Sequence, residues 1–114
     1  MDIEQEKYLV DVQLAIERID VHLQQKRDWN LFDKNITIQS AVKYEFSIIG
    51  EAIYELLKLK PTFVLTDAVK IVSFRNKMVH EYDAIDNVQV WNVIVNYLPK
   101  LEKEVKDLLE NKDN

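Results

Sequence analysis

Residues 37–60 read TIQSAVKYEFSIIGEAIYELLKLK, and they decide the fold because apolar residues recur in them every three or four positions. This spacing places the apolar residues along one face of an α-helix. The main stripe consists of Ile38, Val42, Phe46, Ile49, Ile53 and Leu56, and Ile48, Ala52 and Leu57 widen it. Such a broad apolar face predicts a central helix. Gly50 within it costs about 1 kcal/mol relative to alanine, and we expect it to permit the close approach of a neighbouring helix.

A first helix is predicted over residues 3–27, ahead of the central one. Asp2 and Gln5 have the spacing of a capping box at its start. Its apolar face consists of Leu9, Val12, Ile16, Ile19 and Leu23. The connection that follows breaks the periodic pattern, and we expect Trp29 and Phe32 in it to fold back on the end of the bundle.

Two more helices are predicted after Pro61, which ends the central helix. Thr66 is expected to cap the first of these helices, which runs to about His80. The last helix starts at Asp86 with a second capping box, and Pro99 should kink it. Its apolar seam consists of Trp91, Ile94, Leu98, Leu101, Val105 and Leu108.

Length and composition predict a single all-α domain over residues 1–114, folded as an antiparallel four-helix bundle with a frayed tail over 110–114. One glycine and two prolines leave little material for tight turns, and the absence of cysteine excludes disulfides and thiol catalysis. No apolar run is long enough to span a bilayer, and the first residues are acidic where a signal peptide would be basic and then apolar. We therefore expect a cytoplasmic protein without membrane contact.

Residues 75–82 read RNKMVHEY and place an arginine, an asparagine, a histidine and a tyrosine within eight positions. Arg75 could hold a phosphate by two parallel hydrogen bonds, and His80 could move the proton of a ribose hydroxyl. Metal-free cleavage of a phosphodiester needs this set of groups. Asn76 could orient His80 or contact the phosphate, and Tyr82 could touch the substrate.

The spacing within this motif leaves three arrangements open. Arg75 and His80 are five positions apart, which is about 140° around a regular helix, so they do not point into one site directly. The helix could end near Val79 and turn His80 inward, or the long arginine could curl round. Alternatively, a second copy of the chain related by a two-fold axis could supply facing groups. We prefer the last, because the central helix has surface to spare for a partner.

A structural interpretation of the motif also stays open on chemistry alone. Cations in the last turn of a helix complement the helix dipole without any catalytic role. The net charge of −5 argues against general binding of nucleic acid, although the segment 66–85 is neutral, with three acidic and three basic residues. With two histidines, no cysteine and no glycine-rich phosphate loop, we expect neither a metal site nor a cofactor.

The other histidine and most of the tyrosines are expected to have no part in a site. His22 is expected at the surface, since Gln24, Gln25 and Lys26 follow it. The tyrosines assigned to packing are Tyr8, Tyr44, Tyr54 and Tyr97.

Arg75, His80 and Tyr82 resemble the R-x4-H-x-Y signature of the HEPN superfamily, in particular that of the HepT-type toxins. Asn76 fits as well, because the family favours a small polar residue after the arginine. Further matches are I-I-G-E-A over residues 48–52 in the helix two before the motif, and Trp91 and Leu98-Pro99 after it. The resemblance covers nearly the whole chain, and these flanking matches favour a functional site over a simple helix end.

The resemblance implies a helical bundle that forms a two-fold homodimer and acts as a metal-independent endoribonuclease with its site at the dimer cleft. It also implies a toxin of a toxin–antitoxin system, neutralised when a minimal nucleotidyltransferase antitoxin attaches AMP to Tyr82. The expected partners are a second copy, this antitoxin and RNA. The alternative is a non-catalytic binding module that partners the nucleotidyltransferase or is modified by it, which requires Tyr82 but not His80. A plain structural bundle, in which Arg75 and His80 are both dispensable, is a third interpretation.

Overall fold

The computed structural model describes residues 1–59 and 65–111, with the side chain of Tyr82 outside the described part. All regular secondary structure in this part is helical, which confirms the predicted all-α fold. The elements are α1 (Ile3–His22), α2 (Trp29–Asp33), α3 (Ile36–Lys58), α4 (Ala68–His80), the 3-10 turn η1 (Tyr82–Ala84), α5 (Asn87–Asn96) and α6 (Leu98–Glu110).

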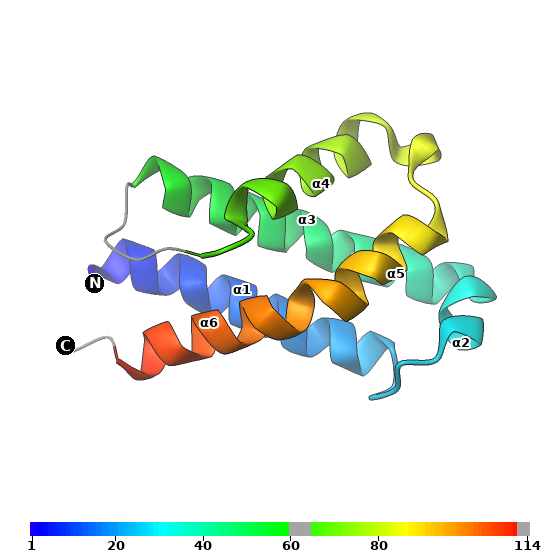
Figure 1. Ribbon diagram of the computed structural model, residues 1–114, viewed down its shortest axis with the longest axis horizontal. Coiled ribbons are helices and arrows are strands. Elements are labelled where there is room, and N and C mark those ends of the chain that lie inside the picture. Colours follow the sequence, from blue (N-terminus) through cyan, green and yellow to red (C-terminus); the bar gives the residue numbers. More distant parts are fainter. Residues whose placement is uncertain (60–64, 112–114) are drawn as a thin grey trace.

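The four predicted helices appear as α1, α3, α4 and the pair α5–α6, which run in alternating directions (Figure 1). The most extensive contact joins α1 to α3, while α4 packs on α3 and α6 packs on α1. The bundle measures 44 × 29 × 19 Å. Helix α1 begins, and helix α6 ends, at the same end of the long axis (Figure 1).

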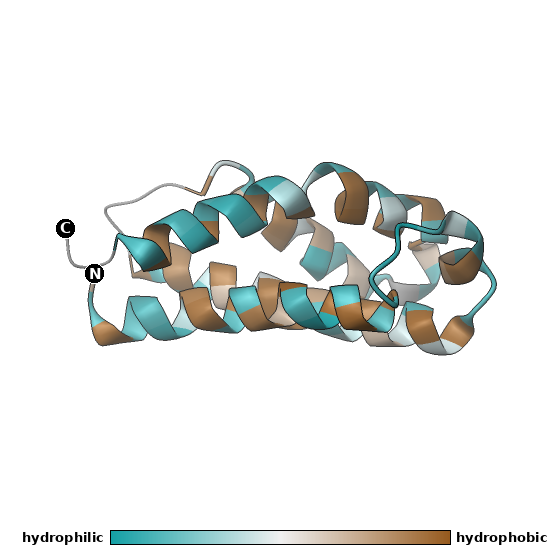
Figure 2. Ribbon diagram, turned by 90° about the horizontal axis from the view of Figure 1, so that it is seen from below, coloured by the Kyte–Doolittle hydropathy of each residue, from teal (hydrophilic) through white to brown (hydrophobic). Residues whose placement is uncertain are grey.

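The apolar faces of the helices turn toward one another (Figure 2), and they form a single core. Every residue of the predicted α1 stripe and of the main α3 stripe is buried, as predicted. Among the residues that widen the α3 stripe, Ala52 is buried, Ile48 is half-buried and Leu57 is 42% exposed. Helix α3 is therefore the central helix, with α1 on one side and α4 on another.

Helix α1 has the predicted start but ends five residues early. Asp2 and Gln5 form the expected capping box. The predicted extension to residue 27 is wrong, because Gln24 and Gln25 adopt left-handed backbone angles, with φ of 59° and 60°. The Gln25 N–H turns back to donate to the carbonyl of Asp20 at 2.8 Å, which closes the helix end.

The connection after α1 holds a short helix, α2, that seals one end of the bundle. Phe32 is fully buried, and its ring centroid lies 5.5 Å from that of Trp91. Trp29 makes an edge contact with Trp91 at 5.9 Å. These contacts confirm the prediction that Trp29 and Phe32 fold back on the bundle.

Two predicted features of α4 to α6 need correction. Thr66 does not cap α4, because its N–H and hydroxyl both bond to the Glu104 carboxylate, at 3.1 and 2.6 Å, and so tie the start of α4 to α6. The single kinked last helix is two helices that meet at Tyr97, with Pro99 in the first turn of α6. A first turn tolerates proline, since its missing N–H would lack a helical partner there. The capping box at Asp86 is confirmed.

His22 is also not the plain surface residue that we expected. Its side chain is 30% exposed, and its Nε2 lies 2.9 Å from Oε2 of Glu45. Glu45 is the one buried charged residue in the described part, and its Oε1 accepts a hydrogen bond from Nε of Arg18 at 2.9 Å. This cluster joins α1 to α3. The spacing of apolar residues could not predict it, because Glu45 is a charged residue at a buried position of α3.

We expect Arg18→Ala to lower the free energy of unfolding by about 1–3 kcal/mol, because it removes one of the two side chains that bond to the buried Glu45 carboxylate. Urea unfolding followed by circular dichroism measures this change. Lys7→Ala is the matched control: the Lys7–Asp11 pair, at 3.0 Å, is exposed. Its loss should leave the stability close to that of wild type, because water and salt screen an exposed ion pair. Equal losses in the two variants would contradict the assignment.

Candidate functional site

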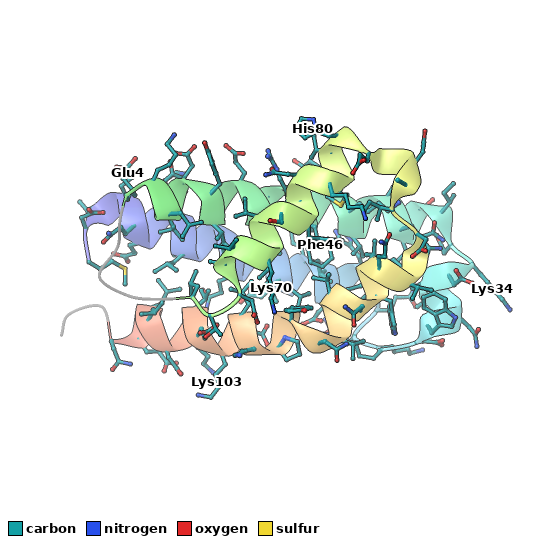
Figure 3. All side chains as sticks on the ribbon, turned by 45° about the horizontal axis from the view of Figure 1, so that its top comes forward. Glu4, Lys34, Phe46, Lys70, His80 and Lys103 are labelled. Atoms are coloured by element: carbon teal, nitrogen blue, oxygen red, sulfur yellow. The ribbon has the colours of Figure 1, made fainter. Side chains whose placement is uncertain are left out.

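Arg75, Asn76 and His80 all lie in the last two turns of α4. The helix runs through His80, as predicted, so His80 is not turned inward by an early helix end. His80 is exposed and projects from the outer edge of the bundle, whereas Phe46 lies inside it (Figure 3). Of the arrangements considered above, a curled arginine is the one that the single chain adopts.

Gly50 of α3 makes this conformation of Arg75 possible. A Cβ atom added at Gly50 would overlap Cβ and Cγ of Arg75, so the aliphatic part of the arginine lies directly on the glycine backbone. The expectation that Gly50 admits a neighbouring helix is therefore correct. The group that approaches it is the side chain of the motif arginine.

The guanidinium of Arg75 is held from two directions. Its Nη2 donates to Oε2 of Glu51 at 2.8 Å, and its Nη1 donates to Oδ1 of Asn76 at 3.0 Å. The Nε atom is buried and has no hydrogen-bond partner in the described part of the chain. The side chain is 25% exposed, so the two Nη groups are the part of the arginine that a ligand could reach. Asn76 thus orients Arg75, in addition to any contact with a ligand.

A pocket of about 350 Å³ is lined by Glu51, Tyr54, Arg75, Asn76 and His80. It collects the three motif residues of α4 and two residues of α3 in one place. The arrangement sets a permanent cation, an imidazole, a carboxylate, a phenol and an amide around one cavity. These groups can bind a phosphate and transfer protons close to it.

Two lining residues, Glu51 and Tyr54, were missed as candidates. Glu51 stood in the sequence only as part of the I-I-G-E-A match, and Tyr54 was assigned to packing. Tyr54 is in fact 46% exposed, and Tyr44 is 65% exposed, so the packing assignment is wrong for both. The available signal was their position beside the apolar stripe of α3, on the side that α4 approaches.

Tyr82 is the first residue of η1, directly after α4 and Glu81. Its side chain lies outside the described part of the structure. The neighbouring residues Glu81, Asp83 and Ala84 are exposed.

A second pocket, of about 380 Å³, adjoins the first and shares Glu51 and Arg75 with it. Lys7, Tyr8 and Ser47 are among its other lining residues. A hydrogen bond to the Asp11 carboxylate raises the pKa of Lys7 above its ordinary value, so Lys7 is a cation at neutral pH. The Arg75–Glu51 pair therefore lies between the two pockets and lines both of them.

No three histidine or acidic side chains in the described part of the chain come together as ligands of a metal ion would. None of its helices combines the length and the apolar character needed to cross a membrane.

Residues 12–108 match the family described as Ribonuclease HepT-like. The chain belongs to this family. A HepT-like assignment agrees with the resemblance seen in the sequence and with the helical bundle. It also supports a function of the RNase type.

Similar proteins bear names that agree with the HepT-like assignment. A protein named "Putative RNase" from Caldanaerobacter subterraneus subsp. tengcongensis is 31% identical over 80 residues, which is 69% of this chain and 71% of that protein. Another of the same name from Methanocaldococcus jannaschii is 34% identical over 80 residues, 69% of this chain and 73% of its own length. A third, named "Gamma-glutamylcyclotransferase and putative RNase", also from M. jannaschii, is 26% identical over 93% of this chain and 48% of its own length. No solved structure gives a significant match.

Proposed function

We propose that this HepT-like chain is a metal-independent endoribonuclease whose site is the pocket between α3 and α4. The observation that carries the proposal is that one pocket contains both an arginine held in a fixed orientation and an exposed histidine. The family match and the names of the similar proteins support RNA as the substrate class.

In the proposed reaction, the 2′-hydroxyl of a ribose attacks the adjacent phosphate. Arg75 binds that phosphate and stabilises the charge that develops on it, and His80 serves as a general base or acid. In the free protein the Glu51 carboxylate occupies part of the donor face of Arg75. The RNA phosphate therefore either binds the guanidinium together with Glu51 or displaces Glu51 from it. Asn76 continues to hold Nη1 of Arg75 in place.

We further propose that the chain is the toxin of a toxin–antitoxin system and that a minimal nucleotidyltransferase antitoxin attaches AMP to Tyr82. The position of Tyr82 supports this, because it follows the helix that carries the pocket and its neighbours in the turn are exposed. An AMP group there would add a phosphate and a base two residues beyond His80. It would obstruct the pocket both sterically and electrostatically.

The proposed active form is a two-fold homodimer in which two pockets meet in one cleft. Tyr54 at the pocket and Val79 beside His80 are 46% and 49% exposed, which gives the rim an apolar surface for a partner. Light scattering at tens of micromolar should give a mass of about twice the 13.5 kDa of one chain. A monomer at that concentration would remove the shared cleft from the proposal.

Cleavage of total cellular RNA in excess chelator tests the nuclease. Wild type should cut and leave 2′,3′-cyclic phosphate ends, whereas His80→Ala and Arg75→Ala should not. Arg27→Ala is the matched control, because Arg27 pairs with Asp20 at 2.7 Å in the connection after α1, away from the pocket residues. Equal behaviour of all four proteins, each shown to be folded, would contradict the nuclease proposal.

The second candidate function is the non-catalytic module that partners a nucleotidyltransferase. The observation that favours it is that Arg75 is already paired with a carboxylate and that the chain carries a net charge of −5. This function predicts that wild type is modified with AMP but leaves RNA uncut, and that Tyr82→Phe blocks the transfer while His80→Ala does not. Mass spectrometry after incubation with ATP and the nucleotidyltransferase measures the transfer, and RNA cleavage by the same wild-type sample would exclude the non-catalytic module.

A further inference from the structure

Cleavage of RNA through its 2′-hydroxyl requires two proton transfers, and the proposed function, on which this inference rests, assigns only His80 to them. One proton leaves the attacking 2′-oxygen, and another must reach the departing 5′-oxygen. Within the described part of the chain, the pocket offers two further ionisable groups besides the arginine. They are the carboxylate of Glu51 and the phenol of Tyr54.

Glu51 is the better acceptor of the 2′-hydroxyl proton. A glutamate ordinarily carries a negative charge at neutral pH and can take up a proton, whereas a tyrosine ordinarily is already protonated and can only donate. An imidazole ordinarily titrates near neutral pH, so His80 is the residue of the pair that can deliver a proton as an imidazolium. Glu51 is therefore suited to accept the first proton and His80 to donate the second, as the reaction requires.

The position of the Glu51 carboxylate suits a base that acts next to a bound phosphate. Its Oε2 lies 2.8 Å from Nη2 of Arg75, so a phosphate bound by the guanidinium would lie beside it. Its other oxygen, Oε1, makes no hydrogen bond to any described residue. The side chain is 53% exposed, which leaves it open to a substrate. The charge of Arg75 offsets the repulsion between the carboxylate and the phosphate.

We propose that Glu51 is the general base of this site and that His80 is its general acid. The Glu51 carboxylate removes the proton from the 2′-hydroxyl, and the 2′-oxygen forms a bond to phosphorus. The bond from phosphorus to the 5′-oxygen breaks, and the His80 imidazolium gives its proton to that oxygen. The products are a 2′,3′-cyclic phosphate and a free 5′-hydroxyl, so atoms and charge balance.

A purely structural role for Glu51, holding Arg75 in place, is the competing explanation. The Glu51→Gln variant separates the two roles, because a glutamine retains an oxygen that can accept the hydrogen bond from Arg75 but cannot serve as a base. If Glu51 acts as the base, this variant should lower kcat by about 10²–10⁴-fold with little change in KM. It should also abolish the fall in rate at acidic pH. If Glu51 only positions Arg75, the rate should stay within a few-fold of wild type.

A substrate with a good leaving group tests which residue is the general base and which is the general acid. A dinucleotide such as UpU needs a proton on its departing oxygen, whereas uridine 3′-(4-nitrophenyl phosphate) releases a nitrophenolate that needs none. His80→Ala should therefore be strongly impaired on UpU but recover most of its rate on the nitrophenyl ester. Glu51→Gln should be impaired equally on both. Recovery of Glu51→Gln instead of His80→Ala would overturn the assignment.

Two more variants complete the experiment. Glu55→Gln is the matched control on the same helix, because Glu55 pairs with Lys58 at 3.4 Å and does not line the pocket; it should behave as wild type. Glu51→Asp keeps a carboxylate on a shorter chain, so it should retain the acidic limb of the pH profile at a reduced rate. Wild-type protein that cleaves neither substrate would overturn the proposed function itself. Active wild type with an equally active, folded Glu51→Gln would overturn only the role of Glu51.

Discussion

Gly50→Ala should reduce the rate of RNA cleavage by about 10²–10³-fold, as much as the loss of a donor that stabilises the developing charge. The added methyl group would occupy the space of Cβ and Cγ of Arg75, and these atoms cannot move aside without displacing the guanidinium. Alanine is the better helix former by about 1 kcal/mol, so helix propensity alone predicts a more stable protein. The measurement is the cleavage rate together with the unfolding midpoint of the same sample.

A second substitution at Arg75 shows whether the clash is the cause. Arg75→Gly removes both overlapping atoms, whereas Arg75→Ala would retain Cβ. In the Arg75→Gly background, Gly50→Ala should stabilise the protein, and in the wild-type background it should stabilise less or destabilise. The difference is the interaction term of a double-mutant cycle. Identical stability changes in the two backgrounds, or wild-type cleavage by Gly50→Ala, would refute the packing argument.

Phe32→Ala should lower the free energy of unfolding by about 3–5 kcal/mol, which is a large part of the stability of a domain of this size. Phe32 is fully buried, and its ring contacts both Trp29 and Trp91. Helix α2 has five residues, too few to be stable without these contacts. Thermal unfolding should show a fall in Tm of more than about 10 °C.

Leu57→Ala is the control for this prediction, because it also shortens an apolar side chain to alanine, but at a position that is 42% exposed. Its effect should stay below about 1 kcal/mol. A loss of less than 1 kcal/mol in Phe32→Ala would show that the aromatic cluster does not hold the end of the bundle.

The helices and the core could be predicted from the sequence because their determinants are local. The three- and four-residue spacing of apolar residues identified the buried faces of α1 and α3, and the pairs Asp2–Gln5 and Asp86–Gln89 identified two helix starts. The predictions were wrong where a side chain bonds to a residue that is distant in the sequence instead of to its own helix. Thr66, for example, bonds to a carboxylate 38 positions away instead of capping its own helix.

For the same reason, only the local part of the candidate site could be predicted from the sequence. The motif spacing identified the α4 residues, but the partner of Arg75 is 24 positions away on α3. The 140° between Arg75 and His80 left a curled arginine as one of three possible arrangements, and we preferred a cleft shared by two chains. A glycine that lets a long side chain lie across a helix overcomes that angle, and helical geometry alone does not reveal it. The prediction of a shared cleft between two chains stays a prediction.

The position of the chain ends has a consequence for how this domain can be joined to others. Helix α1 begins and helix α6 ends at the same end of the long axis (Figure 1), while His80 projects from a long side of the bundle (Figure 3). A second domain fused at either of these helices would therefore leave the pocket uncovered. This chain matches 48% of the length of the M. jannaschii protein whose name joins a gamma-glutamylcyclotransferase to an RNase. The same geometry makes either terminus a suitable place for a fluorescent or affinity tag in the assays described above.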